Sequence, residues 1–219
     1  MRFRHLGQNH DALEYWSFCL RDLIPAAAID HTTRLLSEGP ITLHLSKPRS
    51  TKLGHFKRSN SSTYSEISIN RDLGKQRFLF TLVHELAHWK AYRNYGRMIK
   101  PHGVEWKSLF KQMILPTVDD EVFDQELIKA IIAHLKSPKA ASCSDPVLQR
   151  AFDRSEGLDI MTLDSVPIGS RFQLKNGRSF IKELKKRTRF LCIEIDTGRR
   201  FLIPGIAPVI ERSLEKDEI

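Results

Sequence analysis

The chain has 219 residues, 41% of them apolar, which suffices for one medium domain or for one domain with a small appendage. No stretch is long and apolar enough to span a membrane, and the N-terminal residues lack the apolar run of a signal peptide. The three cysteines are odd in number and widely spaced, namely Cys19, Cys143 and Cys192. They predict neither a disulfide framework nor a cysteine metal site, so we expect a protein of the reducing cytoplasm.

The formal net charge of +9 is concentrated in two segments. Residues 171–200 contain ten Lys and Arg against three acidic residues, and residues 47–58 contain five against none. Such clustering suggests a polyanion partner. A solvated basic surface that only keeps the protein in solution is compatible with the same pattern.

Apolar spacing predicts the elements of the first half of the chain. We expect a helix over residues 10–37, interrupted at Pro25, and strands over 41–45 and 64–70. Three further helices are predicted over about 74–95, from Pro101 onward and over about 120–135, the last one capped by Asp119 or Asp120.

After residue 160 the pattern becomes one of short strands. Two segments on either side of Asn176-Gly177 predict a hairpin with a type I′ turn, and residues 190–203 repeat that form around Thr197-Gly198. The predicted fold class is therefore α+β. We assign residues 1–137 to a mostly helical domain with a small sheet, 138–160 to a linker with a short helix, and 161–219 to a small basic all-β domain with an acidic tail.

A metal-binding motif lies inside the long predicted helix, where His84 and His88 are four residues apart with Glu85 between them. On a helix the two histidines differ by about 40° in azimuth and by one turn in height, so both imidazoles can reach one ion. This is the general zinc metallopeptidase pattern, in which the glutamate accepts a proton from the zinc-bound water that attacks the peptide bond.

The third ligand has to come from farther along the chain. A metzincin would need glycine at position 91 and histidine at 94, where this chain has Ala91 and Asn94, so that class is excluded. Glu105 could act as an acidic ligand, but His102, expected just inside the next helix, is favoured because three histidines and a water form a complete catalytic zinc site. We predict one Zn²⁺ per chain, with Glu85 catalytic and the metal held by His84, His88 and His102.

The histidine segments also resemble those of a known family. Residues 80–88, 95–97 and 101–106, with the strand at 66–70, are similar to the SprT-like family of zinc metallopeptidases, which includes the Spartan-type proteases. The resemblance covers about residues 10–135. It implies a zincin-like domain, the three histidines as metal ligands, Glu85 as the catalytic residue and substrates crosslinked to DNA. Many relatives end in a four-cysteine zinc ribbon, whereas only Cys192 stands in the corresponding region, so the tail is either a degenerate ribbon or an unrelated β domain.

The basic residues of the C-terminal region alternate with phenylalanines, which suits a surface for a nucleic-acid backbone. The phenylalanines are also the core residues that a small domain needs, so charge rather than base stacking is expected to bind. The candidate contacts are Lys185, Lys186, Arg187 and Arg189, with DNA favoured over RNA. A second candidate set is Lys47, Arg49, Lys52, Lys57 and Arg58.

The leading hypothesis is a SprT-like zinc endopeptidase that cleaves proteins bound or crosslinked to nucleic acid, as in DNA repair. We expect it in the cytoplasm, where it could associate with the nucleoid. We expect an extended protein substrate to pair with the edge of the strand at 65–70. The alternative is a nucleic-acid-binding adaptor with a structural or vestigial zinc site. Glu85 separates the two hypotheses, because a structural zinc needs no proton acceptor beside it.

Overall fold

The computed structural model describes residues 1–4, 10–49, 52–58, 64–136, 138, 145–158 and 160–211. It divides the chain into two compact units, Met1–Glu156 and Gly157–Ile219. The described residues form six α-helices and two sheets, which confirms the α+β class. None of the described helices is long and apolar enough to cross a membrane.

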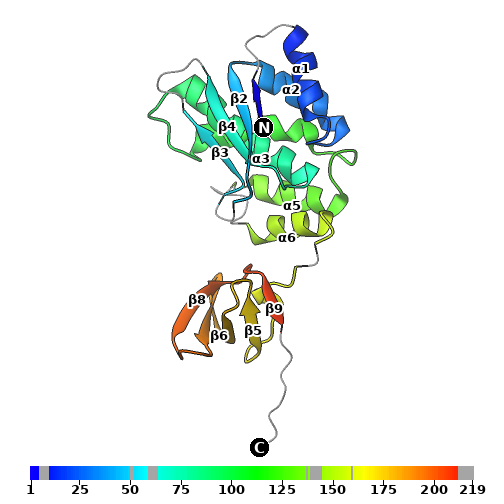
Figure 1. Cartoon of the computed structure of the whole chain (residues 1–219). Helices are drawn as coiled ribbons and strands as arrows, with labels where there is room; N and C mark the ends of the chain where they lie inside the picture. Colours follow the sequence, from blue (N-terminus) through cyan, green and yellow to red (C-terminus); the bar gives the residue numbers. More distant parts are fainter. Residues whose placement is uncertain are drawn as a thin grey trace, which may run out of the picture. The chain divides into compact units, whose positions relative to one another are not determined.

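The sheet of the first unit has four strands in the order β1-β2-β4-β3 (Figure 1). They are β1 (Arg2–Arg4), β2 (Ile41–Ser46), β3 (Gly54–Lys57) and β4 (Ser65–Asn70). Strands β2 and β4 run parallel, while β1 and β3 are antiparallel to their neighbours. The strand β4 therefore lies inside the sheet, and the prediction that its edge receives a substrate is wrong. The short strand β3, which the sequence did not reveal, forms the edge.

The helices of the first unit follow the predicted order with different ends. They are α1 (His10–Leu20), α2 (Ile29–Ser37), α3 (Lys75–Tyr95), α4 (Val104–Ile114), α5 (Gln125–Lys136) and α6 (Pro146–Ser155). A 3-10 turn at Ala26–Ala28 follows Pro25 and separates α1 from α2. Helix α5 begins later than predicted. Asp119 accepts the N–H groups of Glu121 and Val122 and so caps the turn before the helix. The helix itself is capped by Asp124, which accepts the Leu127 N–H at 2.9 Å.

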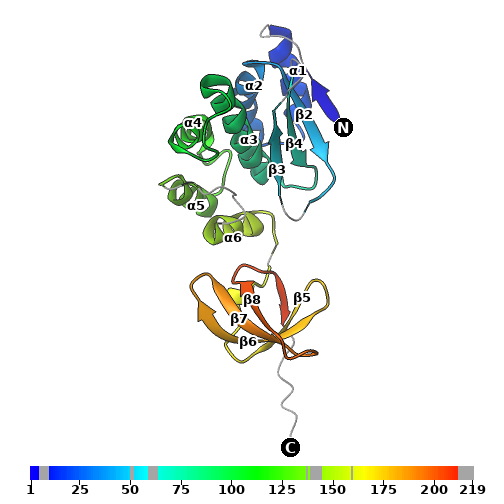
Figure 2. The same cartoon turned by 90° about the vertical axis from the view of Figure 1, so that its left-hand side faces the viewer.

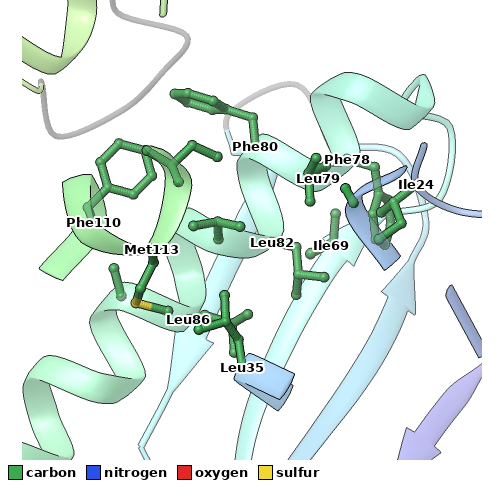
Figure 3. Packing of buried hydrophobic residues seen from close by; sticks show 14 of the residues in the cluster. Ile24, Leu35, Ile69, Phe78, Leu79, Phe80, Leu82, Leu86, Phe110 and Met113 are labelled. Carbon is green, nitrogen blue, oxygen red and sulfur yellow. The ribbon is translucent and has the colours of Figure 1, made fainter. Parts of the chain in front are cut away.

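Helix α3 is the centre of the first unit. The sheet covers one side of it and α4 packs on another, with α2, α3 and α4 on the same side of the sheet (Figure 2). Figure 3 shows Leu79, Leu82 and Leu86 of α3 among the side chains of this core, near Ile69 of β4 and Met113 of α4. Because apolar residues surround it on nearly every side, α3 is held as a rigid element.

Helix α6 belongs to the first unit, although we predicted its sequence as part of a linker. Its Leu148, Ala151 and Phe152 join the same core. Buried Arg77 of α3 ties the helix down through Asp153 at 2.6 Å and Glu156 at 2.9 Å. The apolar face of α6 is thus packed against the first unit, whereas a helix in a linker would have no such partner.

The second unit contains five antiparallel strands in the order β8-β7-β6-β5-β9. They are β5 (Arg171–Leu174), β6 (Ser179–Lys186), β7 (Arg189–Glu194), β8 (Arg200–Pro204) and β9 (Val209–Glu211). The last strand returns to pair with the first, β9 with β5. Its core consists mainly of the buried side chains Leu163, Val166, Phe172, Phe180, Phe190, Cys192, Ile203 and Val209.

The turn between β5 and β6 differs from the prediction. A type I′ turn needs positive φ at both central residues, but at this turn only Gly177 has one, at +85°. The Gly177 N–H donates to the Leu174 carbonyl at 2.9 Å, and the Leu174 N–H to that of Arg178 at 3.0 Å. This is a type I turn followed by a left-handed glycine, which also joins antiparallel strands closely.

Candidate metal centre

Helix α3 presents His84, Glu85 and His88 from within the core of the first unit. His84 and Glu85 are each 7% exposed, and His88 is half-buried. The two histidine rings lie one helical turn apart, with their centroids separated by 5.1 Å. The predicted pair on one helical face is therefore present.

His102 completes the group from a position that differs from the prediction. It precedes α4 rather than lying inside it, in the turn before the N-cap residue Gly103. Its backbone is left-handed, with φ of 58°, a conformation that costs on the order of 1 kcal/mol and that histidine adopts more readily than most residues. This turn brings the imidazole back onto α3.

The three histidines converge on one point. The Nε2 atoms of His88 and His102 are 2.9 Å apart, and each of the three histidines offers a nitrogen within 4.8 Å of the others. Nitrogens bound tetrahedrally to one zinc ion would be about 3.3 Å apart, so a small opening of the pair would accommodate it. Glu105 is exposed and is not part of this group among the described residues, which favours His102 as the third ligand.

The electrostatics of the histidines suit a metal, because ligating imidazoles must be neutral. The pKa of His84 is well below its usual value, mainly because the ring is buried. The nearby His88, His102 and His134 lower it further. Burial also lowers the pKa of His88 to about 3, and burial and then Lys107 lower that of His102. Among the described residues, the buried Nδ1 of His84 has no hydrogen-bond partner, which fits a site built for a further group.

Trp106 of α4 packs against all three histidines. Its ring centroid is 4.7 Å from that of His84, 5.0 Å from His88 and 4.6 Å from His102. It also stacks on Phe110 at 5.1 Å. Trp106 is 1% exposed and thus fixes the three imidazoles by packing rather than by chemistry.

Glu85 lies against the edge strand β3, which sequence reasoning missed. A Cβ atom added to Gly54 would be 2.7 Å from the Oε1 atom of Glu85, so only glycine allows the strand to pass this closely. Burial raises the pKa of Glu85 to about 7, while the Phe56 N–H, Arg49 and Lys52 act in the opposite direction. A carboxyl group with this pKa can both accept and release a proton near neutrality.

The basic residues of the second unit surround its aromatic core, and Lys185 Nζ lies 5.6 Å from the centroid of the Phe190 ring. Lys185, Lys186, Arg187 and Arg189 are exposed around the hairpin between β6 and β7. Phe180 and Phe190 are 1% and 4% exposed, so neither is available to stack on bases.

Lys182, another basic residue of the second unit, is buried. Its Nζ atom donates to the carbonyls of Leu163 and Val166, so it is a structural residue.

The first unit is thus an α+β domain with a group of three histidines that could hold a metal ion. The model of the SprT-like family matches residues 26–123, which contain all three histidines and Glu85. This part of the chain is therefore similar to the SprT-like family. No curated protein and no solved structure shows significant similarity to the chain.

Proposed function

We propose that the protein is a zinc-dependent endopeptidase with a zincin-like first unit. The observation that carries this proposal is the convergence of His84, His88 and His102 beside the buried carboxyl group of Glu85. A zinc ion held by these imidazoles would act as a Lewis acid toward the peptide carbonyl and would acidify a water molecule. Glu85 accepts the proton of the attacking water and then donates it to the leaving amine.

The edge strand β3 is the proposed docking site for the substrate chain. In its antiparallel register with β4, Gly54 pairs with Ile69 and Phe56 with Ile67, and β3 has no further neighbour in the sheet among the described residues. An extended peptide that adds to this edge would pair through backbone groups and accept many sequences. Because Gly54 contacts Glu85, the paired peptide would lie beside the proton acceptor.

Metal removal and restoration tests this function. The chain purified from a zinc-supplemented medium should cleave casein, lose the activity on treatment with a chelator, and regain it on addition of zinc. His88→Ala should remain inactive after the same addition. Casein cleavage that is unaffected by the chelator would rule out the proposed mechanism. Zinc binding without any cleavage, with or without single-stranded DNA, would favour the nucleic-acid-binding adaptor.

Nucleic acid, with DNA favoured over RNA, is the proposed partner that brings this enzyme to its substrates. The exposed strip Lys185, Lys186, Arg187 and Arg189 supports this, because four cations project from one hairpin. Each phosphate neutralised on duplex DNA adds nearly one unit to the slope of log affinity against log salt. Replacing all four residues with alanine should reduce that slope by roughly two to four and leave zinc binding intact. An unchanged slope would show that the strip is only a solvated face.

A further inference from the structure

The sheet of the first unit has one face turned away from α3, and two rows of polar side chains cross that face. The strand register aligns Arg2 of β1, His44 of β2, Ser68 of β4 and His55 of β3 in the first row. The second row consists of Arg4, Thr42, Glu66 and Lys57 in the same strand order. Side chains alternate between the faces of a strand, so these rows share the face opposite the apolar residues Leu43, Ile67 and Ile69.

This face is open within the described part of the chain. Arg2, Arg4, His55 and Lys57 are exposed, His44, Glu66 and Ser68 are half-buried, and Thr42 is buried beneath Arg4. Figure 2 shows α2, α3 and α4 on the other side of the sheet. The two rows therefore form a flat, polar surface rather than a core layer.

Two arginines are held in fixed positions on this surface. The Nε atom of Arg49 donates to Asn70 Oδ1 at 2.8 Å, its Nη1 atom to Ser68 Oγ at 3.3 Å and its Nη2 atom to the Ser68 carbonyl at 3.4 Å. Arg4 Nε donates to Thr42 Oγ1 at 2.9 Å. Arg4 also lies over the Tyr64 ring at 4.5 Å. Two of the five N–H donors of Arg49 stay available for an oxyanion, and a guanidinium fixed in this way loses little conformational entropy on binding.

The charge of the surface is unbalanced. Among the described residues of the two rows and Arg49, four cations (Arg2, Arg4, Arg49 and Lys57) stand against one acidic residue, Glu66, which lies 3.9 Å from Lys57. Burial and this excess of positive charge lower the pKa values of His44 and His55. Burial and then Arg2 lower the pKa of His44, while burial and then Lys52, Arg49 and Lys57 lower that of His55. An anionic partner would relieve the mutual repulsion of these groups.

We propose that this sheet face binds the phosphodiester backbone of a single-stranded nucleic acid. Hereafter it is called the sheet-face site, consisting of Arg2, Arg4, His44, Arg49, His55 and Lys57. An acidic polypeptide is the less suitable partner, because the two rows contain no exposed apolar side chain to form a pocket for peptide side chains. A flat sheet with cations suits a phosphate chain that is bound through charge.

The sheet-face site lies next to the metal centre through β3. His55 and Lys57 project from this strand onto the sheet face, and the backbone of Gly54 in the same strand contacts Glu85. A nucleic acid bound here would hold an attached protein within one strand of the proposed peptide-docking edge. Binding itself does not depend on the peptidase activity, so the two proposals can fail separately.

The test measures the affinity of the full chain for a labelled oligothymidylate by fluorescence anisotropy at several salt concentrations. All proteins carry the alanine substitutions at Lys185, Lys186, Arg187 and Arg189, so that binding by the second unit is suppressed. The sheet-face variant is Arg2→Gln, Arg4→Gln and Lys57→Gln. The matched control neutralises three exposed cations elsewhere in the first unit, Arg21→Gln, Arg34→Gln and Lys129→Gln.

The sheet-face variant should lose roughly two units of the salt slope, because each phosphate contact on a single strand contributes about 0.7. The control should keep the parent slope. His55→Glu, a single exposed substitution, should weaken binding in the same direction if the triple variant fails to fold. Equal losses in variant and control, or no binding left in the parent of this series, would overturn the proposal. The same titrations are repeated with oligouridylate and with polyglutamate. If the sheet-face variant lost affinity for polyglutamate alone and bound both oligonucleotides as its parent does, the face would be assigned to an acidic polypeptide instead.

Discussion

Gly54→Ala should disable catalysis without removing the metal. The added methyl carbon would lie 2.7 Å from Glu85 Oε1, 2.7 Å from Thr81 Cγ2 and 2.8 Å from Glu85 Cγ. Ordinary contact begins at 3.4 Å, so the carboxyl group or the strand must move by about 0.7 Å (3.4 − 2.7). Because a shift of about 1 Å in a catalytic group can cost about a hundredfold in rate, kcat should fall roughly ten- to a hundredfold.

The assay combines zinc content, the free energy of unfolding and kcat on casein. Overpacking of this kind destabilises by about 1–3 kcal/mol, so stability alone does not identify the cause. Gly74→Ala provides a matched control, because its methyl group would lie 2.8 Å from Cγ and Oε1 of Glu156, in a different part of the unit. Gly74→Ala should lose comparable stability and keep its kcat. Full kcat in Gly54→Ala, or an equal loss in both variants, would refute the positioning of Glu85 by β3.

Three further predictions concern the metal, the buried carboxyl group and the second unit. His102→Ala should weaken zinc affinity by orders of magnitude in a competition titration, whereas Glu105→Ala should leave it nearly unchanged, and the reverse ranking would change the ligand set. Glu85 has a raised pKa of about 7, so its contribution to stability is present below about pH 4.5 and is lost as the pH rises through 7. In the chelated protein, Glu85→Gln should therefore be more stable than the parent by about 1–3 kcal/mol at pH 8 and equal to it near pH 4.5, as measured by urea unfolding. A fragment of residues 157–219 should show β-type circular dichroism that is indifferent to a chelator, since Cys192 lies in an apolar core, and a loss of structure would reveal a second metal.

The sequence predicted the elements that carry strong local signals. The apolar period of α3 and the spacing of His84, Glu85 and His88 depend only on helix geometry, and the structure has all of them on one buried helix. His102 was predicted as the third ligand but in the wrong local structure. Its place in a left-handed turn follows from the path between α3 and α4, which no periodicity encodes.

The rest of the site depends on tertiary partners. Strand β3 has four residues, and its role at the sheet edge is defined by pairing with β4 and by contact with Glu85. We predicted α6 as part of a linker because residues 137–160 are rich in Ser, Pro and Asp. Its place in the first unit comes from core contacts and from Arg77, which is distant in the chain. The sheet-face site likewise emerges only from the register, since β1 and β3 bring distant basic segments onto one surface.

The most direct test of the account is the comparison of Glu85→Gln with the parent chain, in zinc content and casein hydrolysis. We predict one zinc per chain in both proteins, because the proposed ligands are His84, His88 and His102, and hydrolysis by the parent alone. Cleavage by Glu85→Gln at the parent rate would contradict the assignment of Glu85 as the proton acceptor. A parent chain that cleaves casein but binds no zinc would contradict the metal centre itself.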